Sequence, residues 1–161
     1  MKIGVISDTH IPVYCDCLPD AIVEHFRDVD MIIHAGDIVE PDVLRALQKT
    51  GIPVEAVCGN MDCADIQSKL PVKKTIKAGK YTIGLIHGWG SPQSLTPEVL
   101  RKEFKHVDVI VFGHTHQPMN QEIDGVLYFN PGSATDAIFA ERRTIGILDL
   151  DGGKTGTIIT L

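Results

Sequence analysis

Two histidines stand one residue apart in the segment Gly113-His114-Thr115-His116. The residues just before them, 107–112, are almost all apolar, which is typical of a strand buried on both faces. In open α/β sheets the loops after the carboxyl ends of the strands form the ligand crevice, so both imidazoles are expected at such an edge. A His-x-His pair in a loop is, by itself, more often solvated than bound to a metal. Its meaning therefore depends on the residues at the ends of the other strands.

Four further strand-like segments also end in side chains that can bind a metal. These ends carry carboxylate, imidazole and amide donors, each beside a glycine or a turn residue that permits close approach of the backbone. Each donor alone could serve only to cap a turn or to bond within a loop. Seven of them at a common edge are better explained as ligands. The predicted metal ligands are Asp8, His10, Asp37, Asn60, His87, His114 and His116.

The chemistry of this donor set restricts the metal. Four imidazoles, two carboxylates and one amide oxygen, with no thiolate, are too rich in nitrogen for Mg²⁺ or Ca²⁺ and lack the sulfur of a structural zinc site. Mn²⁺, iron, Zn²⁺, Ni²⁺ and Co²⁺ remain as candidates. Because seven ligands exceed what one ion takes, two ions that share one carboxylate are the simplest arrangement.

The elements that must position these residues alternate in the first half of the chain. Apolar spacing predicts strands over 2–7, 31–35 and 53–58 and helices over 18–28 and 41–49. Such alternation predicts a parallel sheet whose strand ends lie along one edge. In the second half, turn residues predict three antiparallel pairs: 72–78 with 81–86, 121–123 with 126–129, and 144–150 with 155–160.

Composition narrows the class of protein. A chain of 161 residues, 43% hydrophobic, is long enough for the core of one domain, which we expect to span 1–161. With 15 basic and 21 acidic residues the net charge is −6, which disfavours stable binding to nucleic acid. No segment resembles a signal peptide or a membrane span, so a soluble, cytoplasmic protein with no membrane partner is expected. Nothing compels a dimer, and a homodimer stays open.

The four cysteines suggest no site of their own. Their spacings, Cys15-x-Cys17 and Cys58-x4-Cys63, do not match the Cys-x2-Cys pattern of a zinc ribbon. A reducing compartment also argues against a framework of disulfides. We therefore treat them as ordinary small residues near loops.

Taken in chain order, the donors form five short blocks. They are Asp8-x-His10, Gly36-Asp37, Gly59-Asn60-x-Asp62, His87-Gly88 and Gly113-His114-Thr115-His116, and Asn130-Pro131-Gly132-Ser133 comes after them. This series resembles the signature of the calcineurin-like metallophosphoesterase superfamily, and within it the small bacterial and archaeal phosphodiesterases of the YfcE type. The resemblance implies an α/β fold, a four-layer α/β/β/α sandwich of two mixed sheets flanked by helices.

The resemblance also implies roles for the donors. Asp8, His10 and His116 would hold a first metal and Asn60, His87 and His114 a second, with Asp37 bridging the two. The implied activity is that of a phosphoesterase, in the first place a phosphodiesterase for a small substrate. A hydroxide between the two ions would attack phosphorus in line, while Asp37, Asn60 and His87 position metal and phosphate. Mn²⁺ is the first choice, with Ni²⁺, Fe²⁺, Zn²⁺ and Co²⁺ as alternatives.

One position departs from the family pattern. Many members have histidine after the asparagine of the third block, where it is thought to protonate the leaving oxygen; this chain has Met61. Since a general acid contributes roughly 10²–10⁴-fold, its loss predicts slow turnover of poor leaving groups and better rates on activated aryl esters. Asp62, which orients that histidine in those members, is expected instead to support the metal-binding residues from behind. Two loop aromatics, Tyr14 and Trp89, either line the substrate mouth or pack on their own loops.

A second hypothesis comes from another class of protein. A subunit of retromer resembles the same family and works mainly as a scaffold with a weakened set of metal ligands. The alternative function is therefore a non-catalytic, metal-stabilised protein-interaction module of the same fold. All seven ligand positions are intact in this chain, which favours catalysis.

Overall fold

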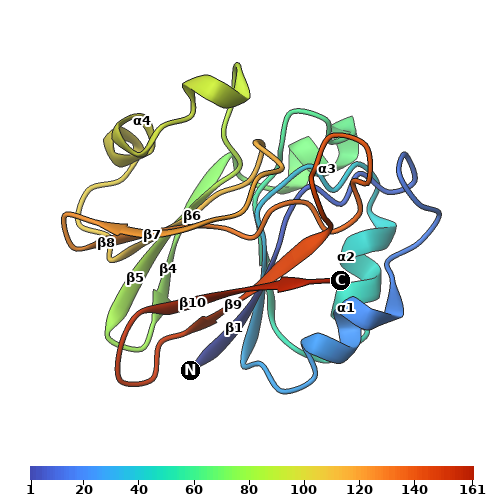
Figure 1. The fold of residues 1–161 in the computed structure, drawn as a ribbon. Helices are drawn as coiled ribbons and strands as arrows, with labels where there is room; N and C mark the ends of the chain where they lie inside the picture. Colours follow the sequence, from blue (N-terminus) through green and yellow to red (C-terminus); the bar gives the residue numbers. More distant parts are fainter.

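Two five-stranded sheets form the centre of the computed structural model, which describes residues 1–161 (Figure 1). The first sheet has the order β10-β9-β1-β2-β3. Its three N-terminal strands, β1 (Lys2–Ile6), β2 (Met31–His34) and β3 (Val54–Ala56), run parallel, as their alternation with helices predicts. The predicted hairpin of β9 (Thr144–Asp149) and β10 (Thr155–Thr160) extends the sheet antiparallel to β1.

The second sheet has the order β4-β5-β6-β8-β7. Its central strands β5 (Tyr81–Ile86), β6 (Val109–Val111) and β8 (Val126–Asn130) are parallel. The edge strands β4 (Lys73–Ala78) and β7 (Met119–Ile123) pair antiparallel with β5 and β8 in the two remaining predicted hairpins. Both sheets are therefore mixed, and the carboxyl ends of their parallel strands carry the predicted ligands.

Short helices cover the outer faces of the sheets (Figure 1). The first sheet is covered by α1 (Asp20–His25), α2 (Asp42–Gln48) and α3 (Ala64–Lys69), and the second by α4 (Pro97–Glu103) beside the 3₁₀ turn η1 (Pro92–Ser94). Three buried apolar clusters separate the layers: one between the sheets, one under α1 to α3 and one under α4. The four-layer α/β/β/α sandwich is thus confirmed.

The elements differ from their predicted bounds mainly by being shorter. The predicted helix 18–28 is only α1, because Pro19 is still extended and the helical backbone is lost at Phe26. The strand predicted over residues 107–112 is likewise shorter in the structure, where β6 spans only Val109–Val111. Helix α3 was not predicted; its single buried residue, Ile66, makes its apolar periodicity too weak to recognise. None of the helices is long and apolar enough to cross a membrane.

Candidate metal centre

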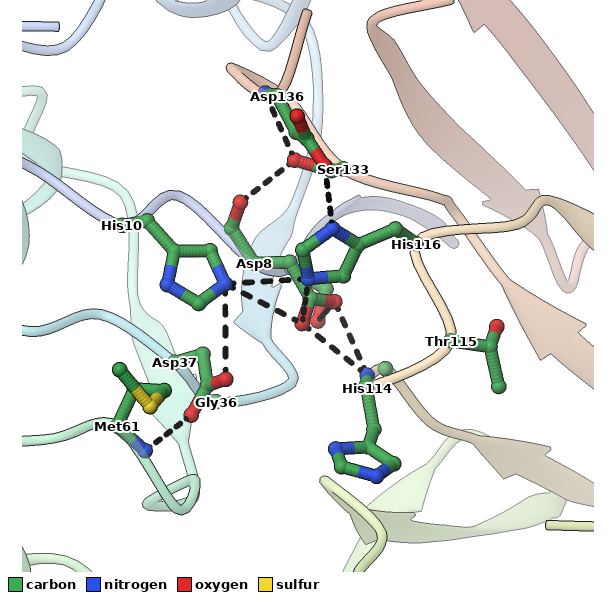
Figure 2. Close-up of polar contacts among 12 residues, drawn as sticks. Asp8, His10, Gly36, Asp37, Met61, His114, Thr115, His116, Ser133 and Asp136 are labelled. Atoms are coloured by element: carbon green, nitrogen blue, oxygen red, sulfur yellow. Dashed lines mark hydrogen bonds and ion pairs between the residues drawn. The ribbon is translucent and has the colours of Figure 1, made fainter. Parts of the chain in front are cut away.

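The predicted donors reach the same edge of the sandwich from both sheets. Asp8 and His10 follow β1 and Asp37 follows β2, whereas His87 follows β5 and the two histidines of the Gly113 block follow β6. Figure 2 shows the side chains of Asp8, His10, Asp37 and His116 gathered within one cluster of polar contacts. The site therefore depends on how the two sheets are stacked.

The backbone is strained at these donors. Asp8, His10, Asp37, His114 and His116 all have positive φ angles, between 42° and 69°. Non-glycine residues rarely adopt this left-handed conformation, and in folded proteins it collects at functional sites where surrounding contacts hold it in place. Five donors share this conformation, so the loops are shaped for the side chains they carry.

Two glycines of the blocks allow the donors to approach each other. A Cβ atom on Gly113 would lie 2.0 Å from Ser7 Oγ and 2.8 Å from Asp8 Oδ2. Gly36 has a φ of +93°, and a Cβ atom there would lie 2.7 Å from His87 Cβ. Any side chain at either position would push a donor away, which is the physical reason for glycine there.

One group of donors consists of Asp8, His10 and His116, whose ligand atoms lie close together. His116 Nε2 is 3.3 Å from Asp8 Oδ1 and 3.1 Å from His10 Nε2, and His10 Nε2 is 3.9 Å from Asp8 Oδ1. Ligand atoms that bind one ion at about 2.0–2.2 Å are at most about 4.4 Å apart. All three atoms fit a single ion.

A second group consists of Asp8, Asp37 and His87. His87 Nε2 lies 3.2 Å from Asp37 Oδ2 and 3.9 Å from Asp8 Oδ1. Asp37 Oδ2 is also 3.5 Å from His10 Nε2, so this carboxylate stands between the two groups. Asp8 belongs to both groups as well, which makes the two carboxylates the link between them.

The tautomer of His87 leaves its buried Nε2 without a hydrogen-bond partner among the protein atoms. Its Nδ1 lies 2.8 Å from the carbonyl oxygen of Ala35, which can only accept, so Nδ1 carries the proton. Its Nε2 is buried, has no hydrogen-bond partner, and faces the oxygens of Asp8 and Asp37. A lone pair directed at two carboxylates is unfavourable unless a cation or a proton lies between them. The donor set therefore fits a divalent cation.

The pKa values of the histidines reflect the same need for positive charge. Burial alone would lower the pKa of His87, but the contact with Asp37 and the charge of Asp8 outweigh it and raise the pKa to about 9. Burial is likewise outweighed at His116, where Asp8 and Asp136 raise the pKa to about 9. At His10 burial prevails and lowers the pKa despite Asp37 and Asp8.

The two carboxylates show the complementary effect. Burial would raise the pKa of Asp8, but His116 and His87 lower it below its usual value. At Asp37 the pKa is also lowered, because His87 and the backbone N–H of Met61 outweigh burial. Both side chains therefore stay ionised in a buried place, where protonated imidazoles or divalent cations can balance them.

His114 approaches the cluster through its backbone and its ring. Its N–H donates to both oxygens of Asp8 at 3.1 Å (Figure 2). Its Nε2 donates to the carbonyl oxygen of Gly90 at 2.8 Å, and its ring stands edge-on to that of His87 with centroids 5.2 Å apart. Since Nε2 carries the proton, Nδ1 is the nitrogen of His114 available to a metal.

The third block contributes through its backbone. The side chain of Asn60 is exposed, but the neighbouring Met61 N–H donates to Asp37 Oδ1 at 2.8 Å, which places this loop against the cluster (Figure 2). Asp62 is buried and accepts the N–H groups of Val39 at 2.6 Å and Gly59 at 2.7 Å. It touches none of the other predicted ligands directly; it fastens the loop after β2 to the loop after β3.

Asp136 belongs to the site but was not predicted from the sequence. Its Oδ2 accepts the Nδ1 proton of His116 at 2.6 Å, and its backbone N–H donates to Ser133 Oγ, which donates to the carbonyl oxygen of Asp8 at 2.7 Å (Figure 2). Asp136 is fully buried. A carboxylate behind a ligating histidine fixes the ring and its tautomer. The only hint in the sequence is its place three residues after the segment that ends in Ser133.

Two more buried residues hold the donor loops. Asn130 Nδ2 donates to the carbonyl oxygen of Gly113 and to Thr115 Oγ1, each at 3.0 Å, which fixes the turn between the two ligand histidines. His34 accepts the N–H of Gly36 at Nδ1, and its Nε2 lies 3.1 Å from Thr9 Oγ1. Burial lowers the pKa of His34 to about 3, so it acts as a neutral brace beneath the loop.

Comparison with known proteins identifies the family of this chain. The family profile of the calcineurin-like phosphoesterase superfamily domain matches residues 1–153. A probable metallophosphoesterase of Methanothermobacter thermautotrophicus is 39% identical over 155 residues, which cover 96% of this chain and 88% of the relative. The solved structure of an archaeal phosphodiesterase is 29% identical, with a TM-score of 0.79 and full coverage of both chains.

A more distant likeness concerns the fold alone. The crystal structure of Vps29 from Chaetomium thermophilum matches with a TM-score of 0.81 over 100% of this chain and 97% of the other, at 21% identity. At that identity the shared architecture carries no residue roles. The match of the family profile to nearly the whole chain, together with the 39% identical relative, is decisive: the chain belongs to the calcineurin-like phosphoesterase superfamily.

Proposed function

We propose that this protein is a phosphodiesterase with a binuclear centre of divalent transition metals. The observation that carries the proposal is the pair of overlapping donor groups, which share Asp8 and have Asp37 between them. Membership of the family supports hydrolysis of phosphoesters in general. The likeness to an archaeal phosphodiesterase favours diesters over monoesters as substrates.

The proposed ligand sets build on the two groups. Asp8, His10 and His116 would hold one ion, and Asn60, His87 and His114 the other, with Asp37 shared. Such ions lower the pKa of water and neutralise charge on phosphoryl oxygens. Mn²⁺ is our first choice, then Ni²⁺, Fe²⁺, Zn²⁺ and Co²⁺.

Water is the proposed nucleophile of the in-line attack, because the buried hydroxyl groups near the donors are engaged in hydrogen bonds. Ser7 is fully buried and donates to Asp8 Oδ2 at 2.6 Å, and Ser133 is fully buried and donates to the carbonyl oxygen of Asp8. Thr135 is also buried and donates to the carbonyl oxygen of Thr9 at 2.5 Å. Each of these hydroxyls is used as a structural donor, so none is free to attack phosphorus.

The leaving group must depart without acid help from the third block. Met61 is 54% exposed and has no proton to give, and the carboxylate of Asp62 beside it is occupied by two backbone N–H groups. Leaving groups that are stable as anions are therefore the favoured substrates.

The test uses metal-stripped protein with Mn²⁺, Ni²⁺, Zn²⁺ or Mg²⁺ added separately. Hydrolysis of bis-p-nitrophenyl phosphate is compared with that of p-nitrophenyl phosphate, for the wild type and for Asp37→Ala and His87→Ala. The matched control is His25→Ala, because His25 is an exposed histidine on α1, away from the cluster. We expect diester turnover that requires a transition metal, disappears in the two site variants and persists in the control.

The opposite result has a clear meaning. Folded, metal-loaded protein that is inert on both esters would exclude the phosphodiesterase and leave the metal-stabilised interaction module, whose fold is that of Vps29. Turnover of the monoester alone would keep the phosphoesterase and overturn the preference for diesters.

The proposal extends to the setting of the reaction. We expect a small phosphodiester as the substrate, in the cytoplasm, without a stable nucleic-acid or membrane partner; the net charge of −6 supports the exclusion of nucleic acid. The oligomeric state is open between monomer and homodimer. Light scattering of the metal-loaded protein decides between these two states.

A further inference from the structure

Large apolar side chains that are exposed to solvent gather on the loops of the metal centre. The protein has six of them, and the sixth, Val72, precedes β4. The other five lie in the loops that carry the predicted ligands or the carboxylate behind His116. We call these five residues the apolar rim: Val13, Met61, Trp89, Ile138 and Phe139.

Backbone contacts tie three members of the rim to ligands. The N–H of Val13 donates to the carbonyl oxygen of His10, and the N–H of Met61 donates to Asp37 Oδ1 at 2.8 Å. Trp89 comes two residues after the predicted ligand His87. The next residue, Gly90, has its carbonyl oxygen 2.8 Å from His114 Nε2. These apolar side chains therefore start from backbone that touches the metal donors.

The other two members are tied through Asp136. Its Oδ1 accepts the N–H groups of Ile138 at 2.8 Å and Phe139 at 2.9 Å, while its Oδ2 is bound to His116. The rim thus stands on four different loops that converge on one cluster. Isolated exposed apolar residues are common on proteins, but a group carried on loops that converge on one polar cluster indicates a binding surface.

The exposed aromatic residues are likewise concentrated on the loops of the metal centre. The chain has a single tryptophan, three tyrosines and five phenylalanines, and of these only Trp89 (45%) and Phe139 (72%) are largely exposed. The half-buried Tyr14 places its ring 5.1 Å from that of His10. Every aromatic ring that reaches solvent beyond the half-buried level is thus on a loop of the site.

We propose that the apolar rim binds an aromatic group of the phosphodiester, an aryl ring or a nucleobase; this rests on the proposed function. Aromatic rings pair favourably with the faces and edges of Trp and Phe, and with the thioether of Met.

Met61 connects the rim with the departure from the family pattern. The position that lacks the proton donor is itself a member of the rim, so an acid is replaced by an apolar contact. Phenolates leave without protonation far more readily than alkoxides. A site that selects aromatic esters therefore has less need of the missing histidine.

Three diesters that share the p-nitrophenolate leaving group test the proposal: the methyl, hexyl and phenyl p-nitrophenyl phosphates. Only the non-reacting group differs, so the phenyl-to-methyl ratio of kcat/KM measures its binding. Trp89→Ala and Phe139→Ala should each lower this ratio about tenfold, the scale of one aromatic stacking contact. The control is Tyr81→Leu, which removes a half-buried ring at the other end of β5. The variants keep the backbone N–H and C=O groups that bind the ligands.

Two outcomes of this comparison would overturn the inference. A kcat/KM for the phenyl diester that stays at the wild-type value in both rim variants shows that the rim touches neither aromatic ring of the substrate. A hexyl diester that is turned over as well as the phenyl diester shows that the rim selects apolar bulk and not aromatic rings. In both cases the diesterase itself stands, so the failure concerns the rim alone.

A binding measurement separates the rim from the chemistry. Trp89 is the only tryptophan, so its fluorescence reports directly on the rim. Phenylphosphonate and methylphosphonate, which cannot be hydrolysed, are titrated into metal-loaded protein. We expect the phenyl compound to change the Trp89 emission and bind about tenfold more tightly, and the Phe139→Ala variant to lose this advantage. Equal affinity for both compounds would overturn the proposal, whether or not the protein hydrolyses diesters.

Discussion

Replacement of Asp136 tests whether the site depends on the tautomer of His116. In Asp136→Asn, one amide oxygen can still accept the N–H groups of Ile138 and Phe139, but the amide NH₂ then faces His116 Nδ1. An NH₂ group cannot accept the Nδ1 proton, so the ring must shift its proton to Nε2. That is the nitrogen which faces Asp8 and His10, and a protonated nitrogen cannot bind a metal.

The magnitudes can be worked out from the contacts. Asp136→Ala removes a charge-assisted hydrogen bond to His116 and the acceptor of two half-buried backbone N–H groups, which we expect to cost about 3 kcal/mol of unfolding free energy. Asp136→Asn keeps the backbone contacts and should cost only about 1–2 kcal/mol. Metal affinity should fall about 10–100-fold in both variants, because both lose the carboxylate behind the histidine.

The assay measures the two quantities separately. Mn²⁺ affinity is obtained by competition with a chelator, and stability by urea unfolding of the metal-free protein. Asp151→Asn, an exposed aspartate in the β9–β10 turn, serves as the control and should leave both unchanged. The dependence on the tautomer is refuted if Asp136→Asn binds Mn²⁺ as tightly as the wild type, or if the loss of affinity in each variant merely parallels its loss of stability.

Two further predictions concern the residues that brace the donor loops. Asp62→Ala should destabilise the protein by about 1–3 kcal/mol, since it frees two half-buried N–H groups, one of them on Val39, whose φ of 75° is strained for a β-branched residue. Urea unfolding measures the loss, and a change below about 0.5 kcal/mol would contradict it. Because the pKa of His34 is lowered to about 3, its stabilising effect is complete above the unfolded value near 6.5 and fades as pH falls towards 3, by up to about 1.4 kcal/mol per pH unit. His34→Gln should therefore flatten the dependence of unfolding free energy on pH between 6.5 and 4, and identical slopes would refute this assignment.

The sequence predicts the elements of this fold well, because apolar periodicity is a local property. The parallel register of β1, β2 and β3 and the three hairpins are predictable from alternation and turn residues. Element ends are less predictable: α1 spans six residues where a longer helix was expected, since Pro19 and Phe26 lie outside helical backbone. Such limits depend on packing partners far away in the chain.

The donor cluster is partly predictable for a different reason. The five blocks are recognisable by glycine next to a polar donor, and five of the seven predicted ligands indeed supply the atoms of the two close groups. Asp136 is not recognisable in this way, because its function arises from a contact with His116 across 20 positions of the chain. Neither Asp136 nor Asn130 has a neighbour pattern that marks it; only the three-dimensional contact does.

The origin of the donors in two sheets has a consequence for the lifetime of the folded chain. Asp8 follows β1 and His114 follows β6, and 106 positions of sequence separate them. A metal that needs both sheets cannot bind until the sandwich has closed, so it has nothing to hold while the chain is still folding. Metal binding would therefore leave the rate of folding unchanged and lower only the rate at which the native protein unfolds.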